Sequence, residues 1–196
     1  MVTEKKKKVF RQAQIAAAAA KLIVKLGGEH VTIKNLALEI GLSEASIYRH
    51  FSNKSAIFHF LIGYAERILL SDLAYVRNDE LVESPGLDSL MKRHIANVVE
   101  RRGIYFQVFT EVVSMGDRRL NKEALNAIYN YITYVSQIFR KNPSSEYFRK
   151  DSDPDCSAFI FYSLLQSLVN FWTLSDYSFD LKDKFDNVWY NYRISQ

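Results

Sequence analysis

The residues with the most specific chemical arrangement lie in the stretch GLSEASIYRHF, positions 41–51. If this stretch is wound as a helix at about 100° per residue, Ile47 and Phe51 share one face. The opposite face then carries Ala45, Ser46 and Arg49. Small residues would let the helix axis approach the edges of DNA bases, and the arginine could donate two hydrogen bonds to guanine. The pattern therefore predicts a helix that reads the major groove.

Three further side chains near this helix suit the DNA backbone. Tyr48 and His50 lie on its flanks, where they could contact phosphates. Lys54 lies in the first turn of the next helix, where its charge opposes the helix dipole. That position favours a lysine when an anion is close by, and a phosphate would supply one.

The elements that would position these side chains are two short helices at about 33–40 and 44–50, joined by a turn at Gly41-Leu42. Two short helices joined by a glycine turn, with the second presented outward, are typical of helix-turn-helix proteins that bind DNA. Turns of this kind also join helices in structural bundles, so the spacing alone leaves that alternative open.

The charge distribution indicates where a nucleic acid would bind. The first 60 of the 196 residues hold ten Lys/Arg and four Asp/Glu, for a net charge of +6. The other 136 hold sixteen and eighteen, for −2, and the two parts sum to +4. A basic third on a near-neutral body indicates a polyanion partner for that third, with an ordinary solvated surface as the alternative.

The rest of the chain shows the helical period throughout, with no alternating run that would indicate a strand. We therefore predict an all-α fold of about nine helices, with enough apolar residues, 48%, for a packed core. The expected helices are at about 9–26, 33–40, 44–50, 54–77, 85–102, 104–115, 118–141, 154–175 and 180–194. The expected N-caps are Thr32, Ser43, Ser52 or Asn53, Ser84 followed by Pro85, and Asp153 followed by Pro154.

Positions 9–60 resemble the N-terminal domain of TetR-family transcriptional regulators. The resemblance lies in the helix Ile15-Ala18-Ala19-Leu22-Ile23 that ends at Gly27, and in the stretch VTIKNLALEIGLSEASIYRHFSNKSAIF, positions 31–58. In that family, the threonine, the second helix of the motif and the lysine after it meet DNA. The DNA-binding residues expected here are Thr32, Lys34, Ser43, Glu44, Ala45, Ser46, Tyr48, Arg49, His50 and Lys54.

The resemblance also implies a three-helix DNA-binding domain followed by a helical ligand-binding and dimerisation domain. The domains expected are residues 1–53 and 54–196, with the helix at about 54–77 as the connection. The implied function is a homodimeric repressor that a small molecule releases from a near-palindromic operator. The many aromatic side chains of the body could line a pocket for an apolar or aromatic ligand, although aromatic stripes at helical spacing are more commonly core. No ligand-binding residue is assigned.

The resemblance places the dimer interface in the helices at about 154–175 and 180–194. The first of these is apolar nearly all round, so it needs cover from its own domain and from a partner chain. The alternatives are the core helix of a monomer and a membrane span, but serine, glutamine and asparagine residues interrupt the apolar run. We expect a cytoplasmic, nucleoid-associated protein without a membrane segment.

A fainter similarity connects the chain with the nucleoid-occlusion branch of the same family. It lies in SEASIYRHF with Lys54, in the ERR of positions 100–102, and in SDYSFDLKDKFDNVW, positions 175–189. The alternative function is therefore a DNA-bound effector that acts on a cell-division protein. A helical ligand carrier is a third possibility, against which the basic N-terminal third and Lys54 argue.

The sequence offers no site for catalysis, a cofactor or a metal. It contains neither GxGxxG nor GxxxxGK[ST], and its four histidines lack metal-ligand spacing. We expect His30, His59 and His94 at helix surfaces, and the single cysteine, Cys156, as a small buried hydrophobe. We therefore expect a protein that is not an enzyme.

Overall fold

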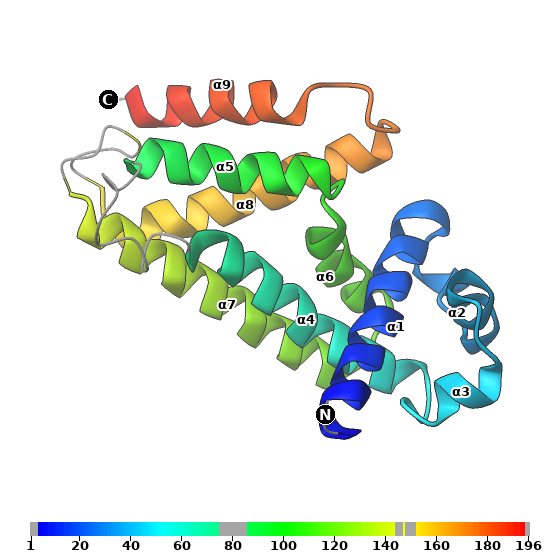
Figure 1. Cartoon of the computed structure of the whole chain (residues 1–196). Coiled ribbons are helices and arrows are strands. Elements are labelled where there is room, and N and C mark those ends of the chain that lie inside the picture. Colours follow the sequence, from blue (N-terminus) through cyan, green and yellow to red (C-terminus); the bar gives the residue numbers. More distant parts are fainter. Residues whose placement is uncertain (1–3, 75–85, 144–146, 148–151, 195–196) are drawn as a thin grey trace. The chain divides into compact units, whose positions relative to one another are not determined.

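The computed structural model describes residues 4–74, 86–143, 147 and 152–194, and all regular structure in these residues is helical (Figure 1). Within this part of the chain there are nine α-helices and one short 3-10 helix, in agreement with the all-α prediction. Their bounds are α1 Glu4–Leu26, η1 Gly28–His30, α2 Ile33–Ile40, α3 Glu44–Tyr48, α4 Lys54–Ala74, α5 Leu87–Glu100, α6 Ile104–Ser114, α7 Arg118–Lys141, α8 Pro154–Leu174 and α9 Leu181–Ile194.

The helices group into two compact units. The first comprises the described residues up to Arg67 together with Ile104–Ala127, and the second comprises the described residues of Ile68–Gly103 and Ile128–Gln196. This grouping is not the same as the division between residues 53 and 54 that the sequence predicts. Helix α6 packs against α1 and so lies in the first unit. The predicted boundary between sequence domains remains a prediction.

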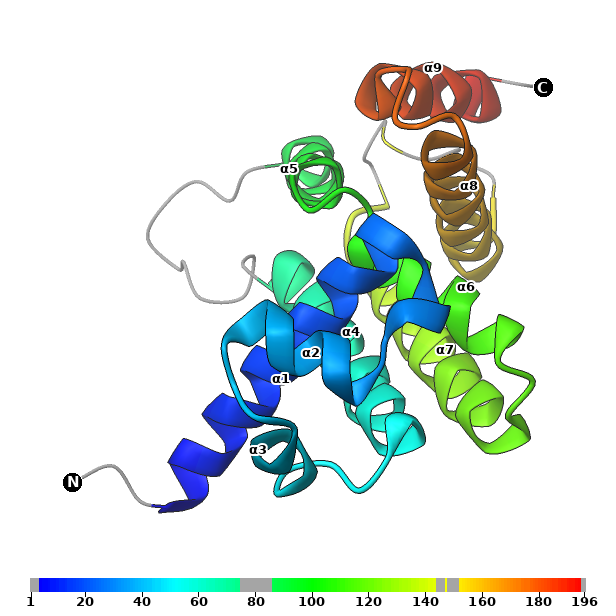
Figure 2. The same cartoon turned by 90° about the vertical axis from the view of Figure 1, so that its right-hand side faces the viewer.

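The first unit is built on the alanine-rich helix α1. Its small side chains let α2 and α6 approach it closely, and α1 packs against both (Figure 2). The buried residues of α1 are Ile15, Ala16, Ala18, Ala19, Ala20, Leu22 and Ile23. Leu36 and Ala37 of α2 and Ile57, Phe58 and Leu61 of α4 are also buried in this unit.

Local sequence signals determine the helix-turn-helix. The Thr32 side chain caps α2 by accepting a hydrogen bond from the Asn35 amide, and Ser43 caps α3 by accepting one from the Ser46 amide. Gly41 ends α2 with φ of 66°, a left-handed conformation that favours glycine. These features confirm the two predicted caps and the predicted turn.

The second unit contains an aromatic cluster formed by α7, α8, α9 and Tyr147. The Phe161 ring lies 5.3 Å from Phe185 and 5.4 Å from Trp189, centroid to centroid. The indole Nε1 of Trp189 donates a hydrogen bond of 2.6 Å to the Tyr147 carbonyl oxygen. Because Phe161, Phe185, Trp189 and Tyr147 are all buried, these aromatic side chains form core.

Several boundaries differ from the prediction. Helix α1 begins at Glu4 instead of about residue 9, so the lysine run continues the helix. Helix α3 ends at Tyr48, two residues early, and η1 has no counterpart in the prediction. Asn53, the second of the two alternatives, caps α4 by accepting a hydrogen bond of 2.8 Å from the Ala56 amide. The predicted cap at Ser84-Pro85 lies outside the described residues.

Two predictions about individual side chains are wrong. His94 has no exposed surface, because it shares the buried face of α5 with apolar residues such as Met91 and Ile95. Cys156 is exposed, because it lies in the first turn of α8 on the side opposite the buried Ala158. The predicted cap of that helix is confirmed, since Asp153 accepts a hydrogen bond from the Cys156 amide and Pro154 opens the helix.

Candidate nucleic-acid interface

Helix α3 has the two faces that its sequence predicts. Ile47 is completely buried and Phe51, just beyond the helix, is 4% exposed, with its ring edge-on to Phe60 at 5.6 Å. On the other face, Ala45 and Arg49 are exposed, and Ser46 is half-buried. An apolar side thus attaches α3 to the first unit, while small residues and an arginine face outward.

The outward arginine is held in place by its own helix. Arg49 follows α3 as its C-terminal cap, and its guanidinium donates a hydrogen bond of 3.2 Å to the Ser46 hydroxyl. Both groups are solvent-accessible, so this bond can be exchanged for hydrogen bonds to a base edge. The planar guanidinium suits the two acceptors of guanine.

The capping hydroxyls of Thr32 and Ser43 are exposed. Each hydroxyl oxygen accepts a hydrogen bond from a backbone amide, at 3.1 Å for Thr32 and 3.2 Å for Ser43. Each therefore still has its proton to donate to a phosphate oxygen. The helix starts that they cap also present unbonded backbone N–H groups, which favour anions.

Lys54 begins α4 and has a partner within the first unit. Its ammonium donates a hydrogen bond of 2.7 Å to the carbonyl oxygen of Gly28 in η1, and it lies 5.6 Å from the centre of the Phe58 ring. Sequence reasoning did not identify this carbonyl, since no local signal connects positions 28 and 54. An ammonium has three protons, so Lys54 can keep this bond and still contact a phosphate.

His50 lies between positive charges from two elements. Burial, followed by the charges of Arg11, Arg49 and Lys8, lowers the pKa of its imidazole below the ordinary value. The buried Nδ1 atom of this imidazole has no hydrogen-bond partner in the structure. Lys8 and Arg11 belong to α1 and were not among the predicted site residues, because their proximity to His50 depends on tertiary packing.

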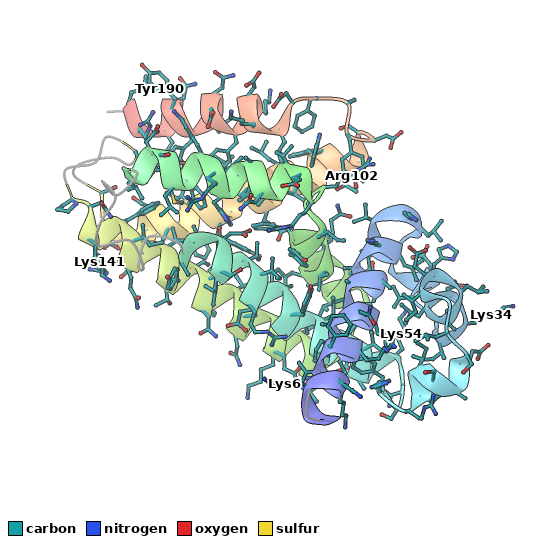
Figure 3. The ribbon with its side chains drawn as sticks, in the orientation of Figure 1. Lys6, Lys34, Lys54, Arg102, Lys141 and Tyr190 are labelled. Carbon is teal, nitrogen blue, oxygen red and sulfur yellow. The ribbon has the colours of Figure 1, made fainter. Side chains whose placement is uncertain are left out.

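The remaining predicted residues also lie at the surface of the first unit. Lys34 in the first turn of α2, Glu44 in the first turn of α3 and Tyr48 are exposed, and Tyr48 retains 55% of its accessible surface. Figure 3 labels Lys34 and Lys54. All ten predicted residues therefore lie between the end of η1 and the first residue of α4, and none of them is fully buried.

The second unit holds a polar cluster that sequence reasoning missed. The imidazole Nε2 of His94 lies 2.8 Å from the Tyr131 hydroxyl, and its Nδ1 lies 4.0 Å from the Asp72 carboxylate, which is ion-paired with Arg101. Burial, helped by the charge of Arg101, lowers the pKa of His94 to about 3. The helical spacing of Leu90, His94 and Val98 was a signal that could have revealed this burial.

The helices that form this surface match a known family of regulators. Residues 15–61 match the model of the bacterial regulatory proteins of the tetR family. The helix-turn-helix of this chain is therefore similar to that of the TetR family. The matched residues run from the middle of α1 into α4, so they include the whole helix-turn-helix. The chain is therefore a DNA-binding regulator.

Relatives of this chain match nearly its whole length. A nucleoid occlusion factor SlmA from Shewanella amazonensis is 25% identical over 185 residues, which cover 94% of this chain and 93% of the relative. The regulatory protein TetR from Rhodobacter sphaeroides shares the fold, with a TM-score of 0.75 and 17% identity over 92% of this chain and 97% of that chain. The regulator FadR from Bacillus subtilis, solved in complex with stearoyl-CoA, has a TM-score of 0.71 and 16% identity. The match covers 92% of this chain and 97% of that chain.

Proposed function

We propose that the protein is a homodimeric repressor that binds a near-palindromic operator through α3 of each copy and is released by a small ligand. The observation that carries the proposal is the two-faced α3, whose buried Ile47 and Phe51 hold Arg49 outward. Thr32 and Lys54 supply phosphate contacts at the starts of α2 and α4. Phosphate contacts fix the orientation on the duplex, and Arg49 supplies base discrimination.

The proposed partner chain is a second copy that covers α8. This helix is long and apolar enough to cross a membrane by length and composition, and 39% of that stretch is buried inside the protein. Phe159, Phe171 and Leu174 are 54%, 63% and 84% exposed, whereas Leu168 is 7% exposed. At about 100° per residue, Phe159, Phe171 and Leu174 fall on one side of α8, which we call the exposed stripe. Exposed apolar residues on one side of a helix are typical of an interface, and the two-fold DNA sites of TetR-type regulators favour a copy of the same chain.

The dimer can be tested with two variants of α8. Phe171→Glu places a charge on the exposed stripe, and we expect a monomer in sedimentation, with an unchanged far-UV spectrum. Leu168→Glu shows the effect of the same charge at a buried position of the same helix. We expect this variant to unfold the second unit. A dimeric Phe171→Glu variant, or binding of the wild-type protein to neutral lipid vesicles, would count against a second copy as the occupant.

The ligand is proposed to be apolar or aromatic and to bind in the body. The complex of FadR with stearoyl-CoA supports this choice by analogy with a protein of the same fold. The aromatic cluster around Phe161 is filled by its own side chains, so no lining residue is assigned from it. Thermal melting with and without stearoyl-CoA tests the proposal, and an unchanged melting temperature at saturating concentration would exclude that ligand.

A second candidate function is a nucleoid-occlusion effector that acts on a cell-division protein. It is favoured by SlmA relatives that match 94% of the chain, including the second unit. Mapping of the bound chromosomal sites in cells separates the candidates. One or a few promoter sites, with derepression of the adjacent genes on deletion, would support the repressor, while many dispersed sites would support the effector.

A further inference from the structure

We propose that Lys8 and Arg11 of α1 form, with His50, a phosphate-binding cluster beside α3, so that α1 is a further DNA-contacting element. The inference rests on the proposed function, in which α3 binds DNA. It extends that function to a helix outside the helix-turn-helix.

The placement of the lysine run supports this cluster. Because α1 begins at Glu4, Lys6, Lys7 and Lys8 are exposed side chains on its first turns. Lys8 and Arg11 are three residues apart and therefore share one side of the helix. In Figures 1 and 2, the first turns of α1 lie beside α3 in the first unit, and Figure 3 labels Lys6 at that end of α1.

The charges that lower the pKa of the His50 imidazole are all positive. Arg11 and Lys8 come from α1, and Arg49 comes from the end of α3, and all three act on the half-buried His50 imidazole. Among the described residues, none of these three cations forms an ion pair with a carboxylate. At the other end of α1, by contrast, Lys25 lies 3.7 Å from the Glu39 carboxylate.

The cluster is also ordered in a way that suits an anion. The Arg11 guanidinium donates a hydrogen bond of 2.8 Å to the neutral amide of Gln14, which orients it without neutralising its charge. Cations from two helices that form no ion pair within the described part of the chain favour a bound anion, and a DNA phosphate is the anion that lies beside a helix in the major groove.

The test compares two double variants of α1 that remove the same charge. K8A/R11A removes the proposed contacts, and K21A/K25A removes two exposed lysines from the other end of the helix. Alanine favours helix, so both variants should melt close to the wild-type temperature. The measurement is the affinity of each variant, at several salt concentrations, for a duplex that the wild-type protein selects from a random library.

We expect K8A/R11A to weaken binding and to reduce the slope of log affinity against log salt by about 1.8, or about 0.9 for each lost phosphate contact. K21A/K25A should keep the wild-type slope. Equal slopes for the two variants would overturn the cluster while leaving the proposed function intact. If the wild-type protein bound no duplex, the proposed function and this inference would both fail.

Discussion

The ammonium of Lys54 donates a hydrogen bond of 2.7 Å to the carbonyl oxygen of Gly28, and this bond ties the start of α4 to η1. The two residues are 26 positions apart, and they flank the helix-turn-helix on both sides. Lys54 therefore has a structural partner as well as a place at the proposed DNA surface. The two roles make different demands on its side chain.

We expect Lys54→Ala to lower stability by about 1–2 kcal/mol, because a charge-assisted hydrogen bond at a half-buried site is lost. It should also weaken operator and non-specific duplex by similar factors, since phosphate contacts carry no sequence information. Lys54→Arg keeps the charge and serves as the control. If melting fell while both affinities stayed at the wild-type values, Lys54 would have only the structural role.

Substitutions on the two faces of α3 should have different effects on stability and on DNA binding. Arg49→Ala should leave melting unchanged and cost about 1–3 kcal/mol of specific binding if the contact to guanine is bidentate. Phe51→Ala should destabilise the protein by about 3–5 kcal/mol, because it empties an aromatic core site next to Phe60. Thermal melting and operator affinity, measured on both variants, check this assignment. If Arg49→Ala bound the operator like the wild type and Phe51→Ala melted like the wild type, the two faces of α3 would be assigned the wrong way round.

The exposed stripe of α8 has a symmetry that suits an antiparallel pair of copies. Phe159 and Phe171 lie equally far from the midpoint between Ser163 and Ser167, which are small residues suited to the closest approach of two helices. In this register, Phe159 of one chain faces the partner's Phe171, and Cys156 faces the partner's Leu174. We therefore expect L174C to form disulfide-linked dimers on oxidation.

The wild-type chain and the variant C156S/L174C are controls for this cross-link. In the antiparallel register, two Cys156 side chains lie about 27 Å apart, from 18 residues at 1.5 Å each, so the wild type should stay uncross-linked. Rapid cross-linking of the wild type would indicate a parallel pair and contradict the register. The assay is a non-reducing gel of the dimer at micromolar concentration.

His94 should make stability fall in mild acid. Its folded pKa of about 3 lies below the ordinary value of 6.5 in the unfolded chain. Between these values the unfolded chain binds a proton that the native protein does not, so stability is complete above pH 6.5 and decreases as the pH falls. We expect a loss of up to about 1.4 kcal/mol per pH unit between pH 6.5 and 5.

Chemical denaturation at several pH values measures this dependence. His94→Gln should lack most of the slope in that window, while His30→Gln, at an exposed histidine, should keep it. The window above pH 5 avoids most of the titration of carboxylates. A slope that is the same in His94→Gln as in the wild type would assign the effect to other groups.

Local signals explain which parts of the fold could be predicted from the sequence. Thr32, Gly41 and Ser43 determine caps and a turn within a few residues of themselves, so α2 and the start of α3 were predicted to the residue. The winding of α3 placed Ile47 and Arg49 correctly for the same reason. The lysine run gave no boundary signal, because lysine is compatible with both a helix and a solvated tail.

The missed features depend on contacts between distant residues. The bond from Lys54 to Gly28, the approach of Arg11 to His50 and the ion pair of Asp72 with Arg101 join different elements, so only packing reveals them. The uneven burial of α8 was also hidden, because its sequence is apolar on nearly every side.

The most direct test of the account is a selection of duplexes by the purified protein from a library with a random central segment. We expect enrichment of one near-palindromic motif, with half-sites about one helical turn apart or somewhat more, because a two-fold dimer presents two copies of α3. Arg49→Ala should lose preference at a guanine in each half-site. Recovery of no motif, or of a single motif without two-fold symmetry, would contradict the central claim.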